Sequence, residues 1–166
     1  MKKAFTLVEI LIVVAILGIL AAIALPTLQG HITEAKESAA KDNLRILRNA
    51  IGLYAAQHND VPPGYPNGDT SATPNWIIFF NQMLKATNVS GQFANVGTPG
   101  YPLGPYLSEV PLNPFRGSQT IQIVVNDEDF PAEPPDIFAW VYKPATKEFR
   151  LDWPGTDKNG LRYYDY

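Results

Sequence analysis

Cysteine is absent from the 166 residues of this chain, and histidine occurs only twice, as His31 and His58. Without cysteine the chain has no disulfide, no thiolate zinc site and no cysteine nucleophile. The two histidines do not have the spacing of metal ligands, and the sequence contains no Gly-rich phosphate loop and no nucleophile elbow. We expect His31 on the surface and His58 as a polar residue at a helix end. The sequence therefore predicts that the protein is not an enzyme and that packing alone holds its folded part together.

Positive charge is scarce in the distal part of the chain. Residues 60–166 contain seven Lys and Arg against twelve Asp and Glu. This acidic balance argues against nucleic acid as an obligate partner. Most of the fifteen prolines and twelve glycines also lie beyond Asp60, which indicates a loop-rich region with short ordered elements. The length leaves room for one globular domain.

A long apolar run occupies residues 4–25, interrupted only by Thr6, Glu9 and the neutral Gly18. As a helix this run would extend about 30 Å, the thickness of a bilayer core. Lys2 and Lys3 precede it directly. Because basic residues favour the cytoplasmic side, we predict a single membrane pass with the N-terminus in the cytoplasm and the following domain outside.

Two simpler interpretations compete with an assembly role for this run. One is an ordinary secretory signal peptide, cleaved after Ala24 to leave a secreted binding protein or enzyme that starts at Leu25, and the other is a plain membrane anchor. Both leave Glu9 unexplained, since a carboxylate near the bilayer centre costs about 2.5–3.5 kcal/mol. The helix itself supplies no cation, so the partner of Glu9 is either the basic residues at the N-terminus or a charge on a neighbouring copy.

The residues around Glu9 resemble a known family. The string Lys-Lys-Ala-Phe-Thr-Leu-Val-Glu at residues 2–9, followed by an apolar stretch up to Pro26, is similar to the N-terminus of type IV prepilins and type II secretion pseudopilins. The resemblance implies that a prepilin peptidase cuts between Ala4 and Phe5 and N-methylates Phe5. The family usually has Gly before the cut, where this chain has Ala4.

The resemblance also implies partners and a location. Glu9 takes the place of the family's acidic residue, which pairs with the N-terminal amine of an adjoining subunit during assembly. The implied partners are copies of the chain itself, minor pseudopilins or pilins, the prepilin peptidase and an inner-membrane assembly platform. The implied location is the bacterial inner membrane with a periplasmic globular domain, and later a filament. A minor pilin or tip adhesin remains an alternative.

The predicted fold class is α+β, with a long N-terminal helix packed on a small antiparallel C-terminal sheet. We divide the chain into a leader (1–4), a transmembrane assembly helix (5–26), an amphipathic helix (27–59) and a loop-rich globular domain (60–166). Gly18 and Pro26 mark the expected weak point of the helix. Apolar residues recur at helical spacing in the amphipathic part; they are Leu28, Ile32, Ala35, Ala39, Ile46, Leu47, Ala50, Ile51 and Tyr54.

The distal half is expected to begin with a second apolar helix over residues 75–87 and to continue with a loop over residues 91–113. Strands are predicted at 120–125, 137–143 and 148–153, the last two joined as a hairpin. Tyr163, Tyr164 and Tyr166 are expected in a final strand docked on the sheet, or alternatively in an exposed contact patch. This layout is also similar to pseudopilins.

The segment Asp157-Lys158-Asn159-Gly160 contains a fragment of a calcium-loop pattern. Some pseudopilins hold calcium in distal loops, so the resemblance makes calcium a possible cofactor. The fragment lacks the distal Glu and the full spacing of an EF-hand loop, and it therefore favours a solvated turn and no cofactor. The acidic run over residues 127–136 is likewise expected to be a solvated loop.

Overall fold

The structure is a computed structural model that describes the backbone of residues 6–166 and the side chains of residues 6–23 and 30–166. Its elements, in chain order, are α1 (Leu7–Gln57), η1 (Pro66–Gly68), α2 (Trp76–Leu84), β1 (Ala86–Thr87), β2 (Phe93–Ala94), β3 (Ile121–Ile123), β4 (Trp140–Lys143), η2 (Pro144–Thr146), β5 (Glu148–Leu151) and η3 (Tyr163–Asp165). The α+β fold class predicted from the sequence, a long N-terminal helix followed by small sheets, is confirmed.

Two compact units divide the chain, one up to Ser38 and the other from Ala39 to Tyr166. The boundary falls inside α1, so the outer part of this helix belongs to the globular unit. Helix α1 is continuous over Gly18 and position 26, the predicted weak point. That this stretch is the weak point of the helix stays a prediction. The part of the chain that the structure describes contains no helix with both the length and the hydropathy of a membrane span.

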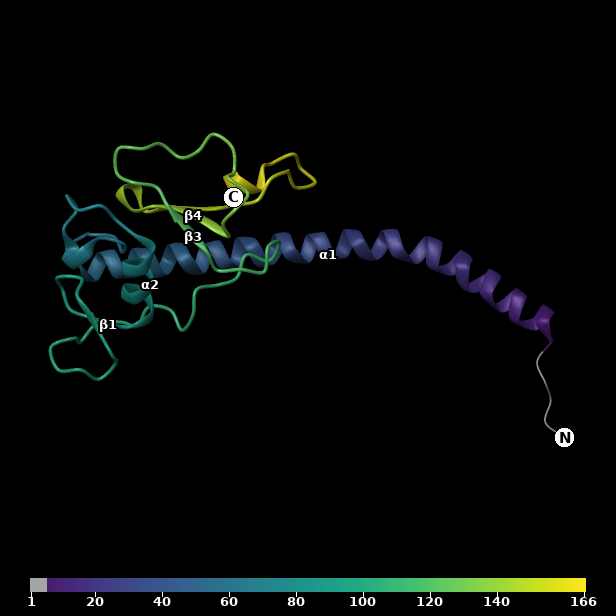
Figure 1. The fold of residues 1–166 in the computed structure, drawn as a ribbon, viewed down its shortest axis with the longest axis horizontal. Helices are drawn as coiled ribbons and strands as arrows, with labels where there is room; N and C mark the ends of the chain where they lie inside the picture. The colour runs from purple at the N-terminus through teal and green to yellow at the C-terminus, as the bar shows by residue number, and fades with distance from the viewer. Residues whose placement is uncertain (1–5) are drawn as a thin grey trace. The chain divides into compact units, whose positions relative to one another are not determined.

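The core of the globular unit lies where the outer part of α1 meets the C-terminal strands, which run alongside it in Figure 1. Helix α1 contributes residues at alternating steps of four and three, which place them on one face; they are Ala40, Leu44, Leu47, Ile51 and Tyr54. The sheet contributes Trp140, Tyr142, Phe149 and Leu151, and α2 contributes Phe79 and Met83. Leu47, Ala50, Ile51 and Tyr54 were predicted correctly as buried residues.

Ile46 is a correction to the predicted core, because 45% of its surface is exposed. It precedes Leu47 by one residue, a rotation of about 100° around the helix, which turns it away from the sheet. Leu44, which the predicted stripe omitted, takes the buried position instead.

The main sheet has the strand order β3-β4-β5. Strands β4 and β5 form the predicted antiparallel hairpin, and the connection η2 ends at Lys147 in the left-handed conformation. Strand β3 pairs with β4 in parallel, so the expectation of an antiparallel sheet is wrong for this pair. The connection from β3 to β4 is long enough to return the chain to the starting edge, which a parallel pair requires. Strands β1 and β2 form a separate antiparallel ribbon, and β2 lies in the region predicted as loop.

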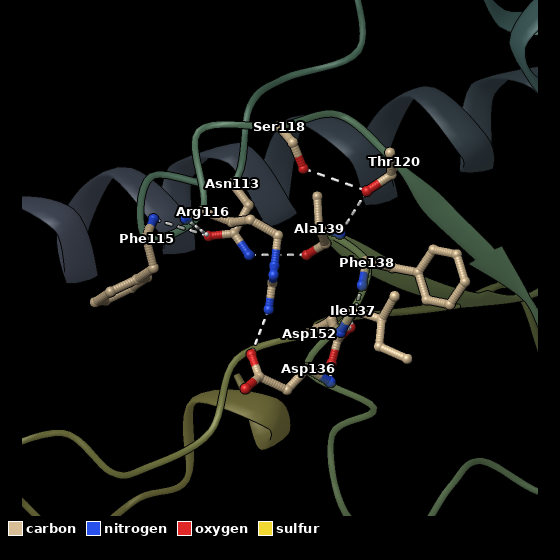
Figure 2. A network of polar contacts seen from close by, with 10 residues as sticks. All are labelled: Asn113, Phe115, Arg116, Ser118, Thr120, Asp136, Ile137, Phe138, Ala139 and Asp152. Atoms are coloured by element: carbon tan, nitrogen blue, oxygen red, sulfur yellow. Dashed lines mark hydrogen bonds and ion pairs between the residues drawn. The ribbon is translucent and has the colours of Figure 1, made fainter.

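Strand β4 begins later than predicted because a buried carboxylate binds the backbone before it. The side chain of Asp152 is buried and accepts hydrogen bonds from the N–H groups of Asp136, Ile137 and Phe138 at 2.8, 3.1 and 2.7 Å. Figure 2 draws Asp152 together with Asp136, Ile137 and Phe138. Backbone that is bonded to a side chain is not available for a strand ladder, so β4 begins only at Trp140.

Asn113 adds further hydrogen bonds to the same network (Figure 2). Its buried carboxamide donates to the carbonyl of Ala139 at 2.9 Å and accepts from the N–H of Phe115 at 2.9 Å. Arg116, from the turn that Asn113 organises, pairs with the carboxylate of Asp136. The chain end packs nearby as the short helix η3 rather than as the predicted strand, with Tyr163 and Tyr164 buried.

Candidate functional site: the N-terminal assembly helix

The first turn of α1 contains the one charged group of the apolar segment. Thr6 precedes the helix, and both its N–H and its hydroxyl donate to Oε2 of Glu9, each at 2.8 Å. The N–H of Glu9 in turn lies 3.3 Å from the Thr6 hydroxyl oxygen. A side chain at the helix start and an acid three residues later that satisfy each other's backbone form a capping box. The sequence Thr-Leu-Val-Glu therefore starts the helix and also fixes the position of the Glu9 carboxylate.

Every described side chain from Leu7 to Ile23 is exposed, and most of them are large and aliphatic. Glu9 is the only Asp, Glu, Lys or Arg between Lys3 and Glu34 in the sequence. Contiguous exposed apolar surface of this kind marks a site for another protein or a membrane. The chemistry that this surface offers is burial of aliphatic side chains around a single carboxylate.

The other predicted site residues are Ala4, Phe5, Gly18 and Pro26. Ala4 and Phe5, the predicted cleavage and methylation site, lie outside the described residues. Gly18 lies within α1 with open space around its Cα, so it presents a bare patch of backbone on the helix surface. The side chain of Pro26 is also outside the described set, although the backbone there is helical.

The two histidines do not come together. The His31 ring lies 3.8 Å from the Glu34 carboxylate, with both side chains exposed. His58 is buried at the end of α1, where Nδ1 donates to the carbonyl of Tyr54 at 2.7 Å and Nε2 lies 3.0 Å from the Thr87 hydroxyl. Burial lowers the pKa of His58 below its usual value, so the ring is held neutral. Its contacts are those of a structural residue.

An apolar cavity of the globular unit has a volume of about 520 Å³ and lies between α2 and the start of β3. Its lining consists of Trp76, Phe80, Gln119, Thr120, Ile121 and Phe138. None of these side chains titrates near neutral pH, so the cavity contains no general acid, base or nucleophile.

The candidate calcium loop fits a metal poorly. Both oxygens of the Asp157 carboxylate already accept hydrogen bonds, Oδ1 from the N–H groups of Asn159 (2.8 Å) and Leu161 (3.1 Å), and Oδ2 from the hydroxyl of Tyr166 (3.1 Å). Among the described residues, no group of three or more His, Cys, Asp or Glu side chains gathers closely enough to hold a metal ion. Calcium prefers six to eight oxygen ligands with several carboxylates, which this loop does not supply.

Comparison with known proteins identifies a motif at the N-terminus of the chain. A family model described as "Prokaryotic N-terminal methylation motif" matches residues 1–25, which include the Thr6–Glu9 capping box. Together with the long N-terminal helix and the small C-terminal sheets, this motif makes the chain similar to type IV pilins and pseudopilins.

Individual relatives come from secretion and from pili. The chain is 36% identical over 61 residues to "Type II secretion system core protein G" of Aeromonas hydrophila, an alignment of 37% of this chain and 43% of that protein. It is 41% identical over 68 residues to "Fimbrial protein EcpB" of Eikenella corrodens, covering 41% and 42% of the two chains. It is 39% identical over 71 residues to "Type IV major pilin protein PilE1" of Neisseria gonorrhoeae, covering 43% and 33%.

These alignments span less than half the length of each of these three relatives. No solved structure gives a significant match to the chain. The similarity to a secretion core protein and to pilins therefore covers only part of each chain.

Proposed function

We propose that the protein is a structural subunit of a type II secretion pseudopilus or a type IV pilus-like filament, and not an enzyme. The observation that carries this proposal is the position of Glu9, a single carboxylate on an exposed aliphatic helix within a methylation motif. The similarity to a secretion core protein and to pilins supports it further.

Maturation precedes assembly in this proposal. The precursor enters the inner membrane with its N-terminus in the cytoplasm and its globular unit in the periplasm. The prepilin peptidase removes residues 1–4 and methylates the new amino group of Phe5. An inner-membrane platform then receives the mature chain, and copies of the chain join with minor pseudopilins or pilins in a filament.

Assembly is driven by two interactions of the same helix. Aliphatic side chains from Leu7 onward are buried against neighbouring helices or lipid, which removes apolar surface from water. The Glu9 carboxylate pairs with the amino group of Phe5 of an adjoining copy. In a low-dielectric surrounding each charge relieves the desolvation of the other only when both are present, so a copy docked in the wrong register is disfavoured.

The N-terminus of the mature protein tests the proposal directly. Mass spectrometry of native material is expected to find a chain that begins with N-methylated Phe5. A native chain that begins at Leu25 would instead identify an ordinary secreted protein and overturn the proposal. Abundance in sheared filaments then separates a major subunit from a minor pilin or tip adhesin.

Substitution of Glu9 tests the pairing. Glu9→Ala is expected to reduce filament formation at least about tenfold, since a lost charge partner costs more than the 1.4 kcal/mol that a factor of ten requires. The matched control is Glu34→Ala, which removes an exposed acid of the same helix that lies 3.8 Å from the His31 ring. Normal filaments from the Glu9 variant would remove the carboxylate from the mechanism.

A further inference from the structure

The loop from Gly155 to Leu161 folds back on itself as a small closed turn. The N–H of Gly160 donates to the carbonyl of Asp157 at 3.0 Å, and the N–H of Asp157 donates to the carbonyl of Leu161 at 2.9 Å. The carbonyl of Gly155 accepts from the N–H of Tyr163 at 3.2 Å. Three carbonyls of the loop therefore face N–H groups of the chain rather than a common centre.

The Asp157 side chain lies inside this turn. Only 3% of its side-chain surface is exposed, so its negative charge requires compensation from the protein. Two backbone N–H groups and one phenol hydroxyl supply part of it, but all three donors are neutral.

The one charged partner of Asp157 in the described structure comes from α1. Nζ of Lys41 lies 3.6 Å from Oδ2 of Asp157 and 4.1 Å from the centre of the Tyr166 ring, whose hydroxyl donates to the same oxygen. The aliphatic stem of a lysine can cross half-exposed surface while its ammonium reaches a buried acid. Lys41 thus occupies the place next to Asp157 where a bound cation would lie.

We infer that Lys41 is the built-in cation of the loop Gly155–Leu161 and that the loop folds and docks on α1 without a metal ion. The two N–H groups and the hydroxyl take three of the about four acceptor sites of the carboxylate, and the ammonium of Lys41 lies 3.6 Å from Oδ2 as an ion pair. A calcium ion would have to displace both the ammonium and backbone donors that also shape the turn.

Electrostatics agrees with this assignment. Burial raises the pKa of the Asp157 carboxyl, but the hydrogen bonds from Asn159, Leu161 and Tyr166 and the charge of Lys41 lower it by more, so the net pKa lies below its ordinary value. Asp157 is consequently ionised at neutral pH and attracts the Lys41 ammonium throughout the physiological range.

The test uses the full-length mature chain in detergent micelles, with calcium chloride or EDTA, and with the variants Lys41→Met and Lys41→Arg. Thermal unfolding reports stability, and hydrogen exchange of the Asn159 and Leu161 amides reports the loop. The control is Arg45→Met, which removes a cation of the same helix that pairs with the exposed Asp42.

Wild-type protein is expected to unfold at the same temperature, within about 1 °C, in calcium and in EDTA. Lys41→Met is expected to speed exchange of the two loop amides about tenfold, while Lys41→Arg and Arg45→Met leave exchange near the wild-type rate. A rise of several degrees in the wild-type melting temperature with calcium would overturn the inference. So would unchanged loop exchange in Lys41→Met.

Discussion

Replacement of Asp152 by Asn is expected to be among the most destabilising single changes that preserve side-chain size in this protein. The carboxylate accepts from three consecutive N–H groups, one on Oδ1 and two on Oδ2 (Figure 2). Asparagine keeps one acceptor oxygen and places an NH2 group where the other oxygen was. The best orientation keeps the two bonds to Ile137 and Phe138 and leaves the N–H of Asp136 facing a second donor.

The expected loss of stability follows from the hydrogen bonds that the substitution removes or weakens. One charge-assisted hydrogen bond disappears, worth about 1.5–3 kcal/mol, and the two that remain become neutral and weaker. We therefore expect a loss of about 3 kcal/mol in the free energy of unfolding, which corresponds to a fall in melting temperature of about 10 °C for a unit of this size.

Thermal unfolding followed by near-UV circular dichroism measures this loss, with the full-length chain in detergent micelles. Asp129→Asn is the matched control, because its side chain is fully exposed and lies 3.9 Å from Lys143, a distance at which a surface pair contributes little. If Asp152→Asn unfolds within a degree or two of the wild type, the three N–H bonds do not hold the start of β4 and the reasoning fails.

Three further predictions test the globular unit by thermal unfolding. Leu47→Ala removes a buried side chain between α1 and the sheet and is expected to lower the free energy of unfolding by about 2–5 kcal/mol. Ile46→Ala, on the exposed side of the helix, is expected to lower it by under about 1 kcal/mol. Equal losses would contradict the assigned core face. The Asn75 side chain caps α2 by accepting from the N–H of Ile78 at 3.0 Å, so Asn75→Ala is expected to cost about 1 kcal/mol and Asn75→Asp much less. The pKa of His58 is lowered in the folded state, so the unfolded chain binds the proton first as the pH falls. The free energy of unfolding is therefore expected to decrease as the pH drops below about 6.5, the ordinary pKa of histidine, toward the folded pKa. The variant His58→Gln should lose this pH dependence, and an unchanged pH profile would rule out the buried neutral ring.

Local patterns predicted the parts of this protein that depend on neighbouring residues in the chain. The apolar run is contiguous, and the long helix, α2 and the β4–β5 hairpin were all recognised from periodicity and turn residues. The N-terminal motif was likewise recognisable, because its specificity lies in the order of residues 2–9 rather than in the fold.

The features that local patterns missed depend on contacts between residues that are far apart in the sequence. Nothing in residues 120–125 indicates that β3 runs parallel to β4, because direction is set by how the intervening chain returns. In the sequence Asp152 is an ordinary acidic residue at a strand end, yet its carboxylate accepts hydrogen bonds from three N–H groups that lie 14–16 positions earlier. The donors to Asp157 include Tyr166 as well as loop amides, and its cation comes from α1, far away in sequence.

The capping box at the start of α1 has a consequence for how tightly filament subunits hold one another. In the isolated chain the Glu9 carboxylate already has two donors from Thr6, so an incoming amino group would exchange one set of bonds for another. The contribution of the Glu9 contact to docking is then the difference between two hydrogen-bonded states, which is smaller than the full value of an ion pair. On the proposed role, such an exchange keeps the growing end reversible: a subunit that leaves the polymer returns to a self-contained state and can be used again.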